Sequence, residues 1–159
     1  MERLLTSDRL ISYHRNRLDI KPYPKSELNI AYFNRKYDQY YTHLSSSEVE
    51  DSLKLKTLKE IYDDLQLGDE IFKYTVPFES LLLIIFNLLK TSKNDDIRLY
   101  TSMCFKQFCK INFSICIINN KGLLLELHSI FCDLNSDVKL YLIEGLIYYS
   151  EYREGKEIL

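Results

Sequence analysis

A seven-residue pattern that occurs twice constrains the fold of this chain more than any other feature. Residues 94–100 return as residues 135–141, a shift of 41 residues (138 minus 97), and six of the seven pairs are identical or similar. In both copies an Asp precedes an apolar residue and a base, as is typical of a helix N-terminus. Repetition at roughly 20 to 50 residues is the mark of stacked repeat proteins. The chain is therefore expected to build the same helix twice.

The spacing of apolar residues predicts where the helices lie. Helices are expected over 26–44, 78–90 and 122–133, and three equivalent helices over 51–65, 96–110 and 137–150. Ser45–Ser47 is expected to cap the helix at 51–65. The resulting period of about 41–43 residues excludes the shorter tetratricopeptide and ankyrin units. Because one helical pair cannot bury its own apolar face, neighbouring pairs must stack, and Leu83 and Leu125 are expected in the core.

The composition favours an all-α protein. The net charge creates no positive electrostatic field that would attract nucleic acid or an anionic membrane. The 159 residues include only four Gly and three Pro, and the formal net charge is −2. The apolar stretch at residues 81–89 is far shorter than the roughly 20 residues that span a bilayer. Mixed charges follow Met1 at once, so no signal peptide is predicted and the protein is expected in the cytoplasm.

The residue types that carry catalysis or bind metals are not gathered in a recognisable pattern. The four cysteines lack zinc spacing and are interpreted as free core thiols, and the three histidines have no companions at ligand or triad spacing. No phosphate-binding glycine pattern occurs. We therefore expect no enzyme activity, no cofactor and no small-molecule substrate. The cysteines are Cys104, Cys109, Cys116 and Cys132.

The N-terminal residues form a separate segment in the predicted organisation. Residues 1–22, which we call the arm, show little apolar periodicity, and residues 23–159 are predicted to form the repeat domain. Residues 1–25 hold six basic and three acidic side chains. The arm is expected to order only on an acidic or grooved partner, because ordering costs roughly 1–2 kcal/mol per residue. The expected donors to that partner are Arg3, Arg9, Arg15 and Arg17.

The order of these segments resembles the armadillo repeat family. The armadillo order is a helix, a short turn and a second helix. Here Val76 and Pro77 lead the first helix, the turn contains Asn and Asp, and the second helix opens with Ile97-Arg98 or, in the other copy, Val138-Lys139. More narrowly, the segment order over roughly residues 19–159 resembles that of the armadillo-type radial spoke proteins of cilia and flagella. The resemblance implies a short, right-handed α-solenoid, in a cytoskeletal subunit of the ciliary axoneme that binds other proteins.

The resemblance also implies where partners bind. In armadillo proteins the third helix of each repeat lines a concave groove, and peptide-carrying members place an Asn ladder there. The matching positions here are Asp64, Gln107 and Tyr148, without Asn or Trp. Tyr148, Tyr149 and Tyr152 are further candidates, because Tyr is favoured at interfaces. Two functions remain open: a structural subunit of a large assembly, or a free-standing adaptor that binds peptides in its groove.

Overall fold

The computed structural model describes residues 27–66 and 78–151, and within these ranges every regular element is a helix and no strand occurs. This confirms the predicted all-α class. The elements in chain order are α2 (Glu27–Ser45), α3 (Asp51–Leu65), α4 (Phe78–Thr91), α5 (Asp95–Phe108), α6 (Asn112–Asn120), α7 (Leu123–Ile130), the 3₁₀ helix η2 (Phe131–Asp133) and α8 (Ser136–Ser150). The arm and Tyr152 lie outside the described residues.

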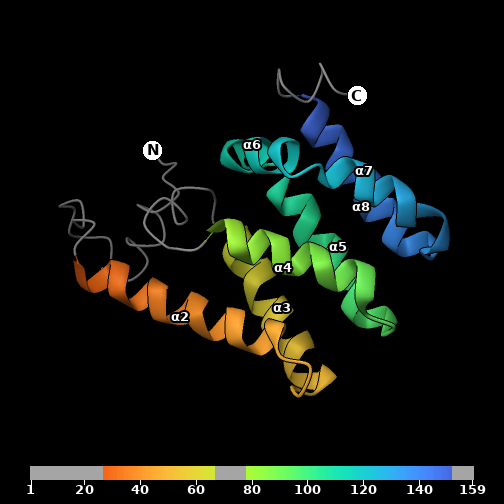
Figure 1. The fold of residues 1–159 in the computed structure, drawn as a ribbon. Coiled ribbons are helices and arrows are strands. Elements are labelled where there is room, and N and C mark those ends of the chain that lie inside the picture. The colour runs from red at the N-terminus through yellow and green to blue at the C-terminus, as the bar shows by residue number, and fades with distance from the viewer. Residues whose placement is uncertain (1–26, 67–77, 152–159) are drawn as a thin grey trace.

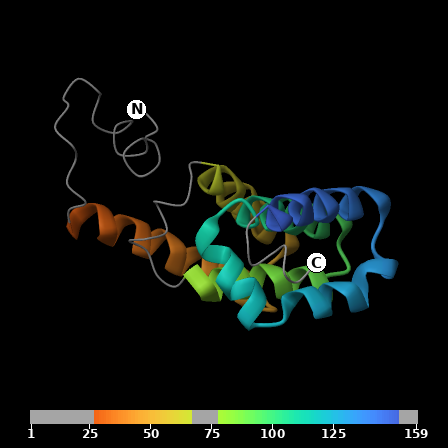
Figure 2. The same ribbon diagram turned by 90° about the horizontal axis from the view of Figure 1, so that it is seen from above.

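The helices form two layers (Figures 1 and 2). One layer holds α3, α5 and α8, and in it α5 contacts both of the others. In the second layer α2 contacts α4, and Lys90 of α4 forms an ion pair with Glu126 of α7. The two layers meet where α2 packs on α3 and α4 packs on α5. The helices predicted to be equivalent therefore lie side by side in one layer.

The core runs through both layers and is centred on α5. Phe105 and Phe108 are 2% and 0% exposed, and the Phe105 ring lies 5.9 Å from that of Phe86 on α4. Cys104 and Cys109 are fully buried on the same helix. Removing this apolar area from water contributes roughly 25 cal/mol per Å². The stack is thus held together mainly by a central helix that is covered by α3, α4 and α8.

The repeated pattern is the N-terminal capping sequence of two helices. The side-chain oxygen of Asn94 accepts the N–H groups of Asp96 (2.9 Å) and Ile97 (3.1 Å). Asn135 accepts the N–H group of Val138 at 3.0 Å in the same way. An Asn cap satisfies N–H groups that have no partner within the helix. This explains why the pattern begins with Asn in both copies.

Three predicted boundaries differ from the structure. The N-cap of α3 is Glu50, which makes no side-chain cap bond, whereas Ser46 accepts the N–H of Glu48 in the preceding turn. Ser45–Ser47 therefore shapes a turn and does not cap the helix. Residues 112–120 form α6, a helix that the sequence interpretation did not predict. The expected helix over 122–133 begins at Leu123, after Gly122 with φ of 66°, and ends as 3₁₀ helix.

Two expectations about burial are wrong. Leu125 is 78% exposed, although it was expected in the core, because α7 turns its neighbours Leu124 and Leu127 inward. Leu83 is partly buried and packs against the core, in line with its prediction. Cys116 and Cys132 are exposed, so only Cys104 and Cys109 are core thiols. Successive residues on a helix point about 100° apart, so an apolar run does not show which member faces the core.

The thiols provide a direct test of this packing. Burial raises the pKa of Cys104 and Cys109, which suppresses the reactive thiolate. We expect a thiol reagent to modify Cys116 and Cys132 in the native protein and the other two only after unfolding. Peptide mass spectrometry after timed alkylation would identify the sites. Rapid native labelling of Cys104 or Cys109 would contradict the position of α5.

Among the described residues, no single helix has the length and apolar character to cross a membrane, and only the bent pair 114–120 and 123–133 meets those criteria when combined.

Candidate protein-binding surface

Lysine side chains lie over tyrosine rings along the layer of α3, α5 and α8. Lys59 of α3 lies 5.2 Å from the ring centroid of Tyr100 on α5, and Lys106 of α5 lies 5.5 Å from that of Tyr141 on α8. Tyr100 and Tyr141 are the last residues of the two repeated patterns. Each repeated tyrosine thus receives a lysine from the preceding helix of the layer. A contact of this kind is worth about 0.5–1 kcal/mol when exposed.

Two further contacts join α5 to α8. Lys106 forms an ion pair with Glu144, and this hydrogen bond is the main reason that the pKa of Lys106 is raised. Lys110 lies 4.7 Å from the ring centroid of Tyr148. Two lysines, two tyrosine rings and the Glu144 carboxylate therefore meet between α5 and α8. This mixed surface can offer both hydrogen-bond donors and flat apolar rings to another protein.

Asp64 is a buried link between α2 and α3. One carboxylate oxygen accepts the Tyr40 hydroxyl at 2.9 Å, and the other accepts the Lys36 ammonium at 3.1 Å. Burial raises the pKa of Asp64, and Lys36 opposes that rise. Because both oxygens bond to α2, the side chain serves the packing of two helices. It is not free to bind a peptide in a groove.

The raised pKa of Asp64 predicts a pH dependence of stability. A carboxyl group whose pKa is higher in the folded state stabilises the fold below its unfolded value of about 3.9, and this contribution is lost as the pH rises through the folded value. Asp64→Asn mimics the neutral form at every pH. We expect the wild-type unfolding free energy, relative to that of the variant, to fall as pH rises from acid to neutral. Urea titrations at several pH values would measure it, and an opposite slope would contradict the raised pKa.

The other predicted site residues divide between surface and core. Gln107 is 7% exposed and Tyr148 is 36% exposed, so of the three predicted groove positions only Tyr148 presents substantial surface. Tyr149 is fully buried and donates its hydroxyl to Asn119 of α6. The expectation that Tyr149 contacts a partner is therefore wrong in this structure. Tyr152 and the four arm arginines, Arg3, Arg9, Arg15 and Arg17, lie outside the described residues.

The sequence interpretation missed Lys59, Lys106 and Lys110 as members of this surface. The repeated tyrosines were visible in the sequence, but a lysine that reaches them comes from the preceding helix, at no fixed interval along the chain. The available signal was the repetition of Tyr100 and Tyr141 itself. An aromatic residue kept at the end of both copies of a repeated pattern indicates a contact that is also repeated.

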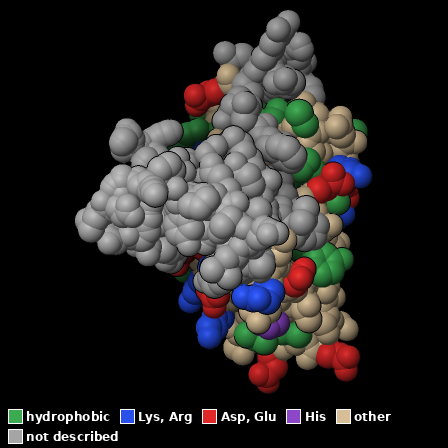
Figure 3. Space-filling model, turned by 90° about the vertical axis from the view of Figure 1, so that its left-hand side faces the viewer, with side chains coloured by type: hydrophobic (Ala, Val, Ile, Leu, Met, Phe, Trp, Pro, Cys, Tyr) green, Lys and Arg blue, Asp and Glu red, His purple; other side chains and the backbone are tan. Residues whose placement is uncertain are grey.

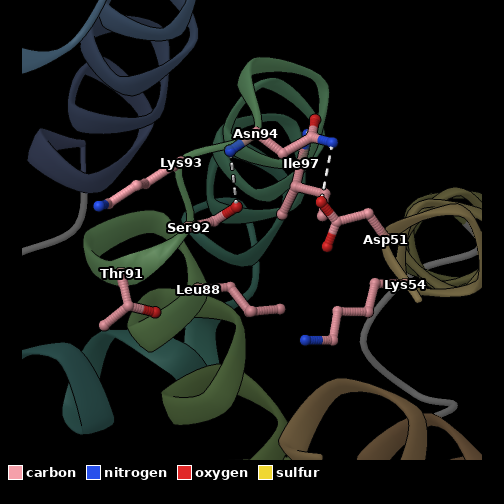
Figure 4. Close-up of a pocket in the computed structure, with 8 residues that line it drawn as sticks. All are labelled: Asp51, Lys54, Leu88, Thr91, Ser92, Lys93, Asn94 and Ile97. Carbon is pink, nitrogen blue, oxygen red and sulfur yellow. Dashed lines mark hydrogen bonds between the residues drawn. The ribbon is translucent and has the colours of Figure 1, made fainter. Parts of the chain in front are cut away.

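A polar cleft of about 490 Å³ lies where α3 and α5 begin and α4 ends. Asn94 donates its side-chain N–H to Asp51 at 3.1 Å, and its backbone N–H to Ser92 at 3.1 Å (Figure 4). Lys54 extends toward Leu88, whereas Lys93 points away from the other side chains. The same Asn that caps α5 thus ties it to α3, so this cleft is chiefly a joint within the stack.

Charges of both signs are interspersed on the coloured part of the face shown in Figure 3.

Within residues 27–66 and 78–151, no group of three or more His, Cys, Asp or Glu side chains is arranged to hold a metal ion. The side-chain contacts of Asp64, Lys106 and Tyr149 each join two helices. No protein-family model, curated protein or solved structure shows a significant match to this chain.

Proposed function

We propose that this chain is a non-enzymatic scaffold that binds other proteins through the surfaces of a short, right-handed, armadillo-like α-solenoid. The observation that carries the proposal is the single layer of α3, α5 and α8, in which a capping pattern and a lysine–tyrosine contact both recur. A stack of repeats exposes extended surfaces instead of one deep pocket. Such surfaces suit contacts with large or elongated partners.

We further propose that the partners belong to a ciliary axonemal complex, the radial spoke, so that the protein is a cytoskeletal component. The resemblance in segment order over roughly residues 19–159 supports this assignment. The burial of Asp64 and Gln107 favours it over the adaptor alternative. An adaptor of the peptide-carrying kind needs a ladder of accessible amide side chains, and here one position is tied to α2 and another is covered.

Purification of the endogenous protein would separate the two functions. A structural subunit is expected to remain with the same partners in fixed stoichiometry after gentle extraction, and quantitative mass spectrometry would measure the ratios. An adaptor is expected to elute mainly as a monomer that binds and releases peptides reversibly. Recovery as a free monomer would therefore contradict the scaffold proposal.

Deleting residues 1–18 tests whether the arm contacts a partner. Because the arm has few apolar residues at regular intervals, we expect the deletion to change the melting temperature little. We expect incorporation into the native assembly to fall, since arginine forks pair with carboxylates on a partner. Replacing Arg9 and Arg15 by Glu in the full chain is the matched control for loss of length. Normal incorporation of both variants would leave the arm without a binding role.

A further inference from the structure

The last helix of the stack carries an uncovered apolar stripe. Leu140, Ile143 and Ile147 are 53%, 46% and 57% exposed, and their spacing places them on one face of α8. Beside the stripe, α7 and α8 border an apolar pocket of about 370 Å³. It is lined by Leu124, Leu127, His128, Phe131, Cys132 and Leu146. We call the stripe and this pocket the end face.

The repeat shows what kind of contact the end face lacks. With the shift of 41 residues, Leu140 and Ile143 correspond to Leu99 and Ser102 of α5, which are partly and fully buried, respectively. Ile147 corresponds to Lys106, whose Cα lies against Gly145 of α8. The face that α5 uses to bind α8 is thus present again on α8, where no described element covers it. Continuity of the stack predicts that another segment packs there.

The charge around the end face selects a basic segment. Residues 131–151 contain four acidic side chains and one basic side chain. Asp133, Asp137 and Glu151 are exposed, and the one base, Lys139, turns back over the ring of Phe131. The first 25 residues of the chain have the opposite balance, with six bases and three acids, and they include apolar residues such as Leu4 and Ile11. Opposite charge steers two such surfaces together.

The segments outside the described ranges differ in net charge, and only a basic segment complements the acidic end face. Residues 67–77 hold one base and two acids, and residues 152–159 hold two of each. Neither segment is basic. The arm is the segment of this chain that combines length, positive charge and apolar side chains.

We propose that the arm of one copy binds the end face of a second copy, which joins copies head to tail. In the layer of α3, α5 and α8, α2 packs on α3, whereas α8 packs on α5. The helix that follows the arm in the chain and the helix that carries the end face therefore lie at opposite ends of the stack (Figure 1). This separation favours a second copy as the source of the arm, and binding within one copy is an outcome of the test.

Sedimentation velocity of the full-length chain at low ionic strength tests this contact. The wild type is expected to show an average mass that rises with concentration, because a head-to-tail contact leaves an arm and an end face free at each step. Added salt is expected to weaken the association. Ile147→Glu blocks the end face, and Arg9→Glu with Arg15→Glu reverses the arm. Each variant alone is expected to sediment as a 19.0 kDa monomer.

Mixing the two variants separates this contact from its alternatives. The Ile147→Glu copy retains an intact arm and the arm variant retains an intact end face, so the mixture is expected to form a dimer that grows no further. Leu53→Glu, at an apolar position of α3 that is 36% exposed, is the control and is expected to behave as wild type. Circular dichroism establishes that each variant is folded.

Three outcomes would overturn the proposal. They are a wild type that stays monomeric at every concentration, association that survives reversal of the arm, and a mixture of the two variants that stays monomeric. The first outcome would mean that the arm binds within its own copy or not at all, the second that the end face pairs with itself, and the third that the arm does not recognise the end face. None of these results bears on the ciliary assignment, which rests on different observations.

Discussion

Replacing Phe105 by Ala is expected to lower the free energy of unfolding by about 3–5 kcal/mol, as truncation of a buried Phe generally does. Phe105 is 2% exposed, packs against Phe86 and lies where α8 crosses α5. The cavity would open at the contact between both layers, so the surroundings have little freedom to collapse into it. A total stability of 5–15 kcal/mol is usual for a domain, so this variant would be markedly weakened. Urea denaturation would measure the change.

Leu125→Ala is the matched control, because it also truncates an apolar side chain. Leu125 is 78% exposed, and its truncation is expected to change stability by less than about 0.5 kcal/mol. If Leu125→Ala cost as much as Phe105→Ala, the orientation of α7 in this structure would be wrong, and the original expectation of a buried Leu125 would be right.

Replacing Gly145 by Leu is expected to cost about 3 kcal/mol through overpacking. A Cβ atom at this position would lie 3.1 Å from the Lys106 Cα and 3.4 Å from both the Cys109 Sγ and the Phe105 Cδ1. The nearest of these atoms belongs to the backbone of α5 and cannot rotate away. A larger side chain must therefore push α8 from α5. Thermal unfolding followed by circular dichroism would show the loss.

Gly145→Ala provides the smaller step at the same site. The helix propensity of Ala favours the variant by about 1 kcal/mol, whereas the short contact with the Lys106 Cα opposes it. We expect these effects nearly to cancel, so that only the larger side chain is strongly destabilising. A Leu variant as stable as wild type would contradict the close approach of the two helices.

The helices were predictable where turn residues or capping patterns mark their ends. Residues 26–44 were predicted for α2, and the repeated pattern located the starts of α5 and α8 to within a residue. The break before α6 was not predictable in this way, because neither Gly nor Pro lies between Phe108 and Asn112. That turn is set by tertiary packing, as the burial of Ile111 at 4% exposure indicates.

Side-chain direction and contacts between helices were much harder to predict. Tyr148 and Tyr149 are adjacent and chemically identical, yet one is 36% exposed and the other is fully buried. Tyr149 points toward α6, where its hydroxyl donates to Asn119. Similarly, Asp64 has the spacing of a groove residue, but Lys36 and Tyr40 of α2 engage both its oxygens. The sequence located the layer of α3, α5 and α8, whereas the contacts of each side chain depend on packing.

The most direct test of the proposed function is to fractionate cells that carry cilia or flagella and to follow the endogenous protein. We predict that the protein remains with demembranated axonemes after detergent extraction, and that high salt releases it together with other components of one complex. Full recovery of the protein in the detergent-soluble fraction, with none on the axonemes, would contradict a structural role in the cilium.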